Sequence, residues 1–516
     1  MLAARPNSAA TSDRGVFICH AYHARAASAR RLGYLAFVNT ELPQIRFARL
    51  ASPSSLEQVK IALDRALGGS KVLVGESACA SYTNDESLLE GRTPDVVVIA
   101  ETAEDIATTL ALAERYEVPV TPRAAGTGRT GGAMCVAGGI VLATHGMAQI
   151  KDINREDLIA VVQPGVVTGH FHKACEAEGL FFPPDPNSAD MCMIGGNVAE
   201  NAGGPRAFKY GVTREYVLGL EVVLMGGRTL RTGKRTVKGV TGYDVTSLLV
   251  GSEGTLGVFT EVTLRLIPNP PAVATVLALF DDVHAAAIAV SRIIAAKLVP
   301  RCLELLDRAT LDAVRKELPI DPRAGAMLLL EVDGEGEGLD AQLERLGEVV
   351  MAVPGVVDVV AAQDAAQRAR LWSARKALSL VTRKMAKHKL SEDVVVPRSR
   401  VPELLTRVDR IGEETRVRHL TYGHAGDGNL HVNFLWDDDE HLPRVEEATL
   451  RLMRETIALG GTLSGEHGIG VTKAAFLPLE QSEGLIQLQR DVKRVFDPKD
   501  LLNPGKIFPT VGHRSC

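Results

Sequence analysis

Pro122-Arg-Ala-Ala-Gly-Thr-Gly-Arg-Thr-Gly-Gly-Ala133 is the segment that says most about the architecture of this 516-residue chain. A predicted buried strand (96–99), a helix (104–116) and a second strand (118–120) lead into it. Its glycines are spaced Gly-x-Gly-x-x-Gly, as in dinucleotide-binding turns, but such a turn opens a helix. Here more glycine and the apolar run 140–143 follow, which predicts a loop and then a strand. The segment is therefore not a Rossmann NAD(P) site.

The same segment can still bind phosphate, because successive backbone N–H groups in a glycine-rich loop form an anion-binding nest without a helix. A plain turn is the alternative, yet glycine and threonine occupy six of the eight positions 125–132, which is more than a turn needs. A second loop of this kind is predicted at Ile194-Gly-Gly-Asn-Val-Ala-Glu-Asn-Ala-Gly-Gly204. Its small residues would let a flat ligand lie against the backbone.

Two short patches carry most of the candidate metal ligands: Thr421-Tyr-Gly-His-Ala-Gly-Asp-Gly-Asn-Leu-His-Val-Asn-Phe434 and Ser464-Gly-Glu-His-Gly-Ile-Gly470. Together they offer His424, His431, Glu466 and His467. Imidazole and carboxylate groups bind Zn, Fe(II) or Mn, and a site open to substrate needs only three of them. The fourth residue could then move a proton. The alternative is a pair of polar glycine-rich turns without a metal, since two histidines seven residues apart match no helical ligand spacing.

Size and composition limit the classes of function. A chain of 516 residues is too long for one core, so two or three domains are expected. The hydrophobic share of 46% is ordinary for a globular protein, and the net charge of −5 gives no basic surface for nucleic acid. No uninterrupted apolar run approaches the roughly 18–20 residues of a transmembrane segment. Peripheral association with a membrane stays open.

The seven cysteines are scattered and include no Cys-x-x-Cys pair, which argues against an iron–sulfur cluster and a disulfide framework. We therefore expect a cytoplasmic protein, with association at the inner face of the membrane left open. Residues 1–54 differ in composition, because the first 50 contain seven arginines and two acidic residues. This pattern is typical of a transit peptide, and a disordered N-terminal extension is the alternative.

The clearest domain boundary is Asn269-Pro-Pro271. Well before it, Ser55-Leu-Glu-Gln58 has the pattern of a capping box at the start of a helix. After the boundary, strands and helices alternate in a β-α-β-β-α-β-like order, which predicts an α+β domain with an antiparallel sheet. A predicted helix over 366–385 carries Arg375 and leads to the two histidine-containing patches.

Several motifs follow one another in a recognisable order: the loop 123–132, Pro184-Asp-Pro186, Gly195–Gly204, Gly251-Ser-Glu-Gly-Thr-Leu-Gly257, His424…His431, Ser464–Gly468 and Leu502-Asn-Pro-Gly505. This set resembles the vanillyl-alcohol-oxidase superfamily, whose members have a PCMH-type FAD-binding domain. The likeness is to the branch of FAD-linked oxidases that contains glycolate oxidase large subunit, D-lactate dehydrogenase and D-2-hydroxyglutarate dehydrogenase. It covers about residues 55–510.

The resemblance implies an α+β protein of two parts behind the N-terminal extension (1–54). A PCMH-type FAD-binding domain of two subdomains would span 55–271. A C-terminal α+β cap with an antiparallel sheet would span 272–510 and hold substrate and metal, with roughly its last 20 residues returning to the FAD domain.

The resemblance also implies which residues contact FAD. The expected contacts are Arg123, Ala124, Ala125, Gly126, Thr127, Gly128, Thr130, Gly131, Pro184, Asp185, Ser188, Gly195, Gly196, Asn197, Asn201, Gly203, Gly204, Glu253, Gly257, Val258 and Asn503. The FAD would be non-covalent, since no histidine lies in the loop 123–132. Ala124 departs from the family, which usually has glycine there. A positive φ at this position would cost alanine roughly 1 kcal/mol.

By the same resemblance, the chain would oxidise a D-2-hydroxy acid, D-lactate or glycolate above all, and pass electrons to an acceptor other than NAD. Arg375 would bind the substrate carboxylate. His424, His431 and Glu466 would hold a divalent metal (Zn, Fe(II) or Mn) that polarises the hydroxyl, and His467 would accept the proton. The acceptor would be a protein or a quinone. Both a homodimer and a hetero-oligomer stay open.

Alternatives remain within this fold. The chain could be a D-2-hydroxyglutarate dehydrogenase or the flavin electron-transfer subunit of a larger complex. Hydroxyglutarate enzymes place a lysine shortly before the proline that matches Pro397. Ser391-Glu-Asp-Val-Val-Val-Pro397 has no clear equivalent, which disfavours a dicarboxylate substrate.

Overall fold

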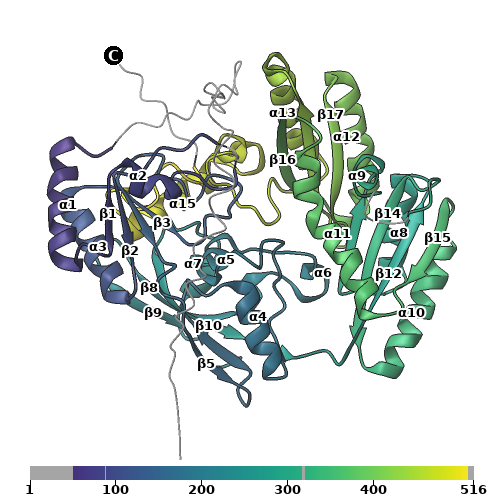
Figure 1. Cartoon of the computed structure of the whole chain (residues 1–516), viewed down its shortest axis with the longest axis horizontal. Helices are drawn as coiled ribbons and strands as arrows, with labels where there is room; N and C mark the ends of the chain where they lie inside the picture. The colour runs from purple at the N-terminus through teal and green to yellow at the C-terminus, as the bar shows by residue number, and fades with distance from the viewer. Residues whose placement is uncertain (1–49, 88, 316–319, 509–516) are drawn as a thin grey trace, which may run out of the picture.

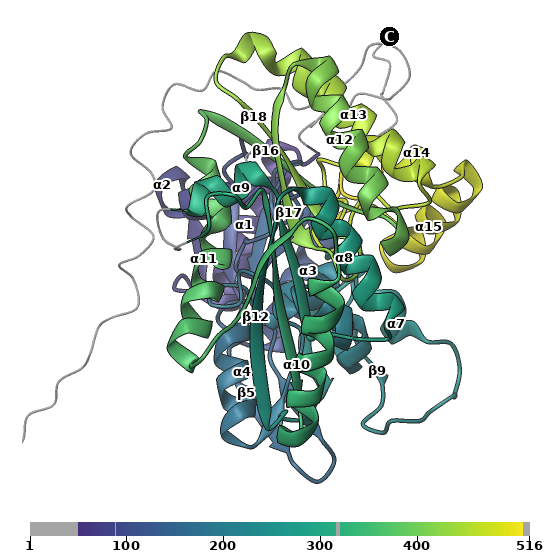
Figure 2. The same cartoon turned by 90° about the vertical axis from the view of Figure 1, so that its right-hand side faces the viewer.

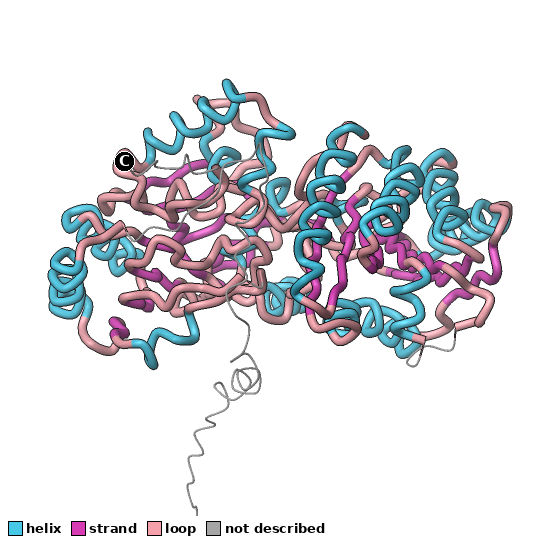
Figure 3. The backbone as a smooth tube through the Cα atoms, turned by 90° about the horizontal axis from the view of Figure 1, so that it is seen from above, coloured by secondary structure: helices cyan, strands magenta, loops and turns pink. Residues whose placement is uncertain are grey.

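The computed structural model describes residues 50–87, 89–315 and 320–508 (Figure 1). Two lobes lie side by side, as the view from above shows (Figure 3). One lobe contains the sheets formed by residues 72–268, and the other contains a seven-stranded sheet formed by residues 272–436. The expectations for residues 1–49 lie outside the described ranges.

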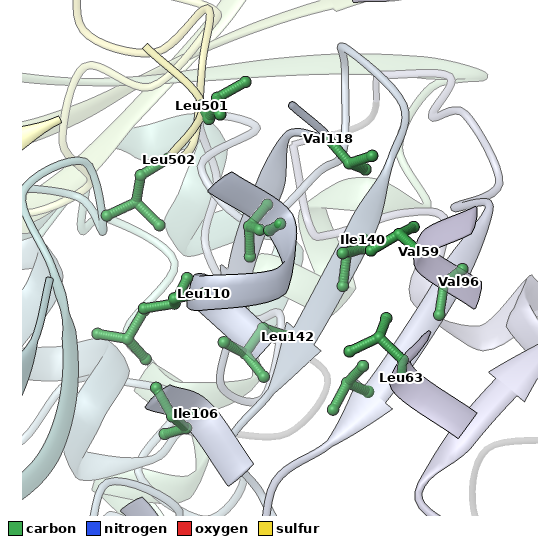
Figure 4. Close-up of a cluster of buried hydrophobic side chains, with 14 of the residues drawn as sticks. Val59, Leu63, Val96, Ile106, Leu110, Val118, Ile140, Leu142, Leu501 and Leu502 are labelled. Carbon is green, nitrogen blue, oxygen red and sulfur yellow. The ribbon is translucent and has the colours of Figure 1, made fainter. Parts of the chain in front are cut away.

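The first sheet of the N-terminal lobe contains the two strands that the glycine-rich loop connects. Its elements are α1 (Pro53–Leu67), β1 (Val72–Val74), α2 (Glu76–Cys79), β2 (Val96–Ile99), α3 (Ala103–Tyr116), β3 (Val120–Arg123) and β4 (Ile140–Ala143). The strand order is β1-β2-β4-β3, with β2, β4 and β3 parallel. Val59 and Leu63 of α1 pack with Leu110 of α3 in the core shown in Figure 4. Leu502 joins this core and pairs with Val120.

The second sheet of this lobe is antiparallel, in the order β5-β6-β10-β8-β9. The elements of this region are β5 (Ile150–Asn154), β6 (Ile159–Val162), α4 (Thr168–Ala177), β7 (Leu180–Phe181), α5 (Ile194–Glu200), α6 (Ala207–Tyr210), β8 (Val217–Val223), β9 (Thr229–Gly233), α7 (Val245–Leu249), β10 (Val258–Arg265) and β11 (Ile267–Pro268). Phe171 of α4 and Leu249 of α7 pack against the sheet in one buried cluster. The connection between β9 and α7 extends away from the lobe (Figure 2).

The second lobe follows β11 directly. Its elements are β12 (Ala272–Phe280), α8 (Val283–Ala295), β13 (Cys302–Leu306), α9 (Arg308–Val314), β14 (Ala326–Gly334), α10 (Gly336–Met351), β15 (Val356–Ala361), α11 (Ala365–Arg383), β16 (His388–Val395), α12 (Val401–Thr415), β17 (Arg418–His424), β18 (Asn429–Trp436) and α13 (Leu442–Ala458). The sheet order is β15-β12-β14-β13-β17-β18-β16, and every neighbouring pair is antiparallel. The predicted α+β cap with an antiparallel sheet is therefore confirmed.

Successive side chains of each strand point to opposite faces of this sheet. Apolar side chains lie on both faces, and helices cover both of them. Leu328 and Leu330 of β14 pack in the cluster that includes α8 and α10, whereas Met327 and Leu329 pack in the cluster that includes α9 and α11. The chain then returns to the N-terminal lobe through α14 (Leu477–Glu480) and α15 (Glu483–Phe496). None of the helices in the described ranges combines the length and apolar character that a bilayer span requires.

Two local predictions were wrong. Helix α1 is capped by Ser52 and begins at Pro53, not at the predicted capping box of Ser55, because proline lacks an N–H and suits the first helical position. The stretch predicted as a second glycine loop begins with helix α5, which ends at Asn201 in the left-handed conformation. There a Cβ on Gly195 would come within 2.5 Å of Pro164, so this glycine allows close helix packing.

Candidate active site

Two histidines seven residues apart reach the same place because β17 and β18 form a hairpin. Tyr422 and His424 are two residues apart on β17, so their side chains point to one face of the sheet. His431 of β18 lies directly opposite Tyr422 and points to the same face. The imidazole rings of His424 and His431 are consequently 5.3 Å apart between centroids, in an edge-to-face arrangement.

Glu466 comes from a loop that a buried aspartate holds in place. The carboxylate of Asp393, on β16, accepts hydrogen bonds from the backbone N–H groups of Gly465, Glu466 and His467 at 2.9, 2.8 and 3.0 Å. It also accepts from the Ser464 hydroxyl at 3.1 Å. This anchoring points the Glu466 side chain toward the two histidines of the hairpin.

His424, His431 and Glu466 are close enough to share one ion. Their ligand atoms all lie within 4.8 Å of one another. Glu466 Oε1 is 3.4 Å from Nε2 of His424 and 3.4 Å from Nε2 of His431. A tetrahedral metal with bonds of about 2.1 Å separates its ligand atoms by about 3.4 Å, and the two distances from Glu466 to the histidines match this value.

Behind the histidines, Glu304 of β13 joins Arg375 to His424. It accepts hydrogen bonds from Arg375 Nε at 2.6 Å and from His424 Nδ1 at 2.5 Å, and Arg375 Nη2 contacts it as well. Burial alone would raise the pKa of Glu304, but the charges of Arg375 and His424 lower it to about 2. Such a carboxylate fixes the histidine ring and directs Nε2 toward the ion site.

Arg375 therefore does not face the site with its whole guanidinium group. Its Nε and Nη2 atoms bind Glu304. The edge formed by Nη1 and Nη2 is the one on which a substrate carboxylate could still be held.

His467 stacks on His431, with ring centroids 5.3 Å apart and an angle of 18° between the planes. Its Nδ1 atom is 3.3 Å from Asp393 Oδ1, and its Nε2 atom is 3.9 Å from Glu466 Oε1. Lys473 binds the same aspartate. Burial alone would raise the pKa of Asp393, but His467 and Lys473 hold it well below its usual range. A permanently ionised Asp393 can orient His467 as a proton acceptor.

The glycine-rich loop of the N-terminal lobe lies against the loop of the other lobe that carries Glu466 and His467. Thr130 donates a hydrogen bond to the backbone carbonyl of His467 at 3.1 Å. Glu253 accepts from the backbone N–H groups of Ile469 and Gly470 at 2.8 and 2.6 Å. Asn503 donates to the carbonyl groups of Gly132 and Glu253 at 3.0 and 2.7 Å. Segments from three distant parts of the chain thus meet beside the histidines.

The glycine-rich loop has the backbone conformation that phosphate binding needs. Gly126 and Gly131 have φ values of +72° and +81°, which few residues other than glycine adopt. Arg123 braces the loop by donating to the carbonyl groups of Asn84 and Ala133 at 2.7 and 3.2 Å. Ala124 does not have a positive φ, so its predicted energetic penalty is absent.

A buried carboxyl group beside the loop also fits a bound cofactor. Glu200 of α5 is half-buried, and its buried Oε2 atom has no hydrogen-bond partner within the described ranges. It lies close to the loop, since a Cβ on Gly132 would come within 3.0 Å of it. Burial and then the charge of Glu253 raise the pKa of Glu200 well above its ordinary value. An unpartnered carboxyl group can bond to the polar atoms of a ligand in the loop.

The other expected FAD contacts are spread around this loop. Asn197 donates to the Thr168 hydroxyl at 2.6 Å, and the carbonyl of Pro184 is 2.8 Å from Nε2 of His172. The Val258 side chain packs in the hydrophobic core with Val223, so only its backbone remains for a ligand. Asp185 pairs with Arg206 at 3.0 Å.

Comparison with known proteins identifies the family. A model described as "FAD binding domain" matches residues 94–233, and one described as "FAD linked oxidases, C-terminal domain" matches residues 269–507. Over 431 residues the chain is 40% identical to glycolate oxidase subunit GlcD of Bacillus subtilis, covering 83% of this chain and 92% of that protein. The chain belongs to the FAD-linked oxidase family. It is also 35% identical to D-lactate dehydrogenase of Anaerostipes hadrus, over 85% of this chain and 94% of that protein.

Solved structures of more distant proteins share the fold. p-Cresol methylhydroxylase aligns with a TM-score of 0.75 at 16% identity, over 89% of this chain and 98% of that one. Alkyldihydroxyacetonephosphate synthase aligns with a TM-score of 0.69 at 18% identity, over 90% of this chain and 87% of that one. These likenesses confirm the predicted PCMH-type architecture.

Sequence reasoning missed three charged residues of this FAD-linked oxidase. Glu304 stands in the apolar strand Cys302–Leu306, where a lone carboxylate could have been recognised as a buried partner. Asp393 precedes a run of valines in the same way. Lys473 follows the second histidine-containing patch, and only the folded chain shows that it reaches Asp393.

Proposed function

We propose that the chain is an FAD-dependent dehydrogenase that oxidises a D-2-hydroxy acid, such as D-lactate or glycolate, to the 2-oxo acid. The observation that carries this proposal is the convergence of His424, His431 and Glu466 next to His467, beside the glycine-rich loop. A metal-ligand set and a proton acceptor at the edge of a flavin site match the needs of a hydroxy acid, which loses one proton and one hydride.

Each group has a separate task in this proposal. The free edge of Arg375 holds the substrate carboxylate. His424, His431 and Glu466 would hold a divalent metal (Zn, Fe(II) or Mn), which when bound would polarise the substrate hydroxyl. His467, oriented by Asp393, accepts the hydroxyl proton. FAD, bound without a covalent link, supplies the hydride acceptor.

The domain limits belong to the same proposal. The FAD-binding domain corresponds to residues 55–271 and the cap to 272–510, with α1 adding Pro53 at the start. The electron acceptor is a protein or a quinone, and the chain works in the cytoplasm or at the inner face of the membrane. The relatives named as subunits of glycolate oxidase favour a hetero-oligomer over a homodimer.

Anaerobic titration of the FAD-loaded protein tests the function. D-lactate and glycolate should bleach the flavin absorbance, L-lactate should not, and a chelator should slow the reaction. His424→Ala should lower the metal content measured by elemental analysis, whereas His441→Ala, in the short helical turn before α13, should not. A flavin that no 2-hydroxy acid reduces would refute the proposal and favour an electron-transfer subunit.

A further inference from the structure

The loop that connects β9 to α7, residues 234–244, exposes an unusual group of apolar side chains. It projects from the N-terminal lobe (Figure 2). Val237, Val240 and Tyr243 are 77, 98 and 98% exposed, and they belong to the four most exposed large apolar side chains of the described ranges. Soluble proteins rarely leave several such side chains together in water, so a group of this kind marks a binding surface.

Hydrogen bonds within the β9–α7 loop give it a defined shape. Lys234 Nζ donates to the carbonyl group of Gly239 at 2.7 Å, and the Thr236 hydroxyl donates to the carbonyl group of Lys238 at 2.8 Å. At the end of the loop, the side chain of Asp244 caps helix α7. The three apolar side chains are therefore presented by an internally bonded loop.

The charged side chains of the loop are positive up to residue 243. They are Lys234, Arg235 and Lys238, and the one acidic residue of the loop, Asp244, is bound to the start of α7. Arg235 lies 3.1 Å from Asp152 of β5, but both side chains are exposed, so water and salt screen this pair. Lys238 forms no ion pair with the described residues. An anionic surface would complement this loop.

Helix α15 reaches the same edge of the molecule, above the loop in Figure 2, and it also lies above α7 in Figure 1. Its side chains Leu485, Leu488 and Val495 are exposed, and their spacing of three and seven residues places them along one side of the helix. Two elements at one edge of the N-terminal lobe thus leave apolar side chains in water. A broad and flat partner could contact both.

We propose that the β9–α7 loop docks the protein on an anionic lipid bilayer. Its three apolar side chains enter the interfacial region, and its three cations bind the lipid headgroups. Tyrosine suits this depth, because its ring is apolar and its hydroxyl group is polar. Lysine suits it as well, because its stem can be buried while the ammonium group stays among the headgroups.

The size of the loop favours a bilayer over a protein partner. A specific protein–protein interface usually buries about 1,200–2,000 Å², more than one short loop supplies. Reversible binding to a bilayer needs only a few inserted side chains and electrostatic attraction. Docking would bring the protein to a lipid-soluble electron acceptor such as a quinone. It does not require the proposed oxidation of a hydroxy acid, so either idea can fail alone.

Vesicle flotation with the FAD-loaded full-length protein measures this binding. Vesicles that contain phosphatidylglycerol and phosphatidylcholine are compared with vesicles of phosphatidylcholine alone. The protein should bind the anionic vesicles about 10- to 100-fold more tightly, because each cation near such a surface adds about a fivefold gain in affinity. This advantage should decrease between about 0.05 M and about 0.5 M salt, since salt screens the attraction.

Replacing Val240 and Tyr243 together by serine should weaken binding to anionic vesicles about tenfold or more, because two inserted apolar side chains are lost. Lys238→Gln should weaken it about fivefold. Val360→Ser is the matched control, because Val360 is an exposed valine on the edge strand β15 of the other lobe. Its binding should equal that of the unsubstituted protein. Circular dichroism checks that each variant is folded.

Tyr243→Trp reports insertion directly. Lipids with brominated acyl chains should quench the fluorescence of this tryptophan. Trp372 and Trp436 lie in the other lobe and give the background, which is measured in the unsubstituted protein.

Three results would overturn the inference. Absence of flotation with anionic vesicles would favour a protein partner for the loop. Equal flotation of the double serine variant and the unsubstituted protein would assign the binding to another surface, such as α15. Bromine quenching of Tyr243→Trp no stronger than the background would show that the loop does not enter the bilayer.

Discussion

Replacing Asp393 by asparagine tests whether this buried carboxylate holds the loop of Glu466 and His467 in the candidate active site. The fully buried carboxylate accepts hydrogen bonds from three successive backbone N–H groups of the loop that carries Glu466 and His467, at 2.9, 2.8 and 3.0 Å. It also binds the ammonium group of Lys473, which is itself buried. An amide has only one acceptor atom and presents two N–H groups of its own. Asp393→Asn would therefore release the loop and leave the Lys473 charge unpaired.

The expected magnitude follows from the burial of this pair. Removing one partner of a buried ion pair costs about 3–5 kcal/mol. For a cooperative unit of about 150–250 residues, each kcal/mol lowers the midpoint of thermal unfolding by about 2–4 °C, which gives a decrease of roughly 6–20 °C. Scanning calorimetry measures the midpoint, elemental analysis the bound metal, and stopped-flow absorbance the rate of flavin reduction. All three should decrease together.

The control is Asp340→Asn, which changes an exposed aspartate on α10. Its unfolding free energy should change by no more than about 0.5 kcal/mol. If Asp393→Asn unfolds within about 2 °C of the unsubstituted protein and retains its metal and its rate, Asp393 does not support the loop and the reasoning fails.

His467→Ala should lower turnover by roughly 10²–10⁴-fold while the FAD and metal contents stay constant; unchanged turnover would remove it from the mechanism. Arg375→Lys should raise the KM for the acid without loss of FAD, since one ammonium group cannot replace a two-edged guanidinium, and an unchanged KM would contradict the carboxylate clamp. Burial, with the charges of Arg129 and Arg383, lowers the pKa of Lys389 to about 7 from 10.5. Between these values the folded protein has lost a proton that the unfolded chain retains, so the contribution of Lys389 to stability should rise with pH. Denaturant melts from about pH 6 to about pH 9 measure this trend, which Lys389→Met should abolish.

Much of the fold could be predicted because it depends on local pattern. The helix predicted over 104–116 and the strand predicted from the apolar run 140–143 are visible in the residues themselves, and both elements form. Errors arose where a neighbour in space decided the outcome. Gly195 was interpreted as part of a loop, yet it lies in a helix that packs against Pro164. Strand β13 was not predicted, although its pairing with β14 and β17 places Glu304 in the site.

The sequence by itself determined the α+β pattern of helices and strands, the glycine-rich loop that excludes NAD(P), and the four residues of the two histidine-containing patches. These are properties of short segments, because torsion-angle preferences and hydrophobic periodicity act over a few residues. Only the tertiary structure decided which charged side chains contact and orient those four residues. Glu304 is 120 positions from His424, and Arg129 is 250 from Ser379. Such pairs depend on strand order and on how the two lobes meet, which no local pattern encodes.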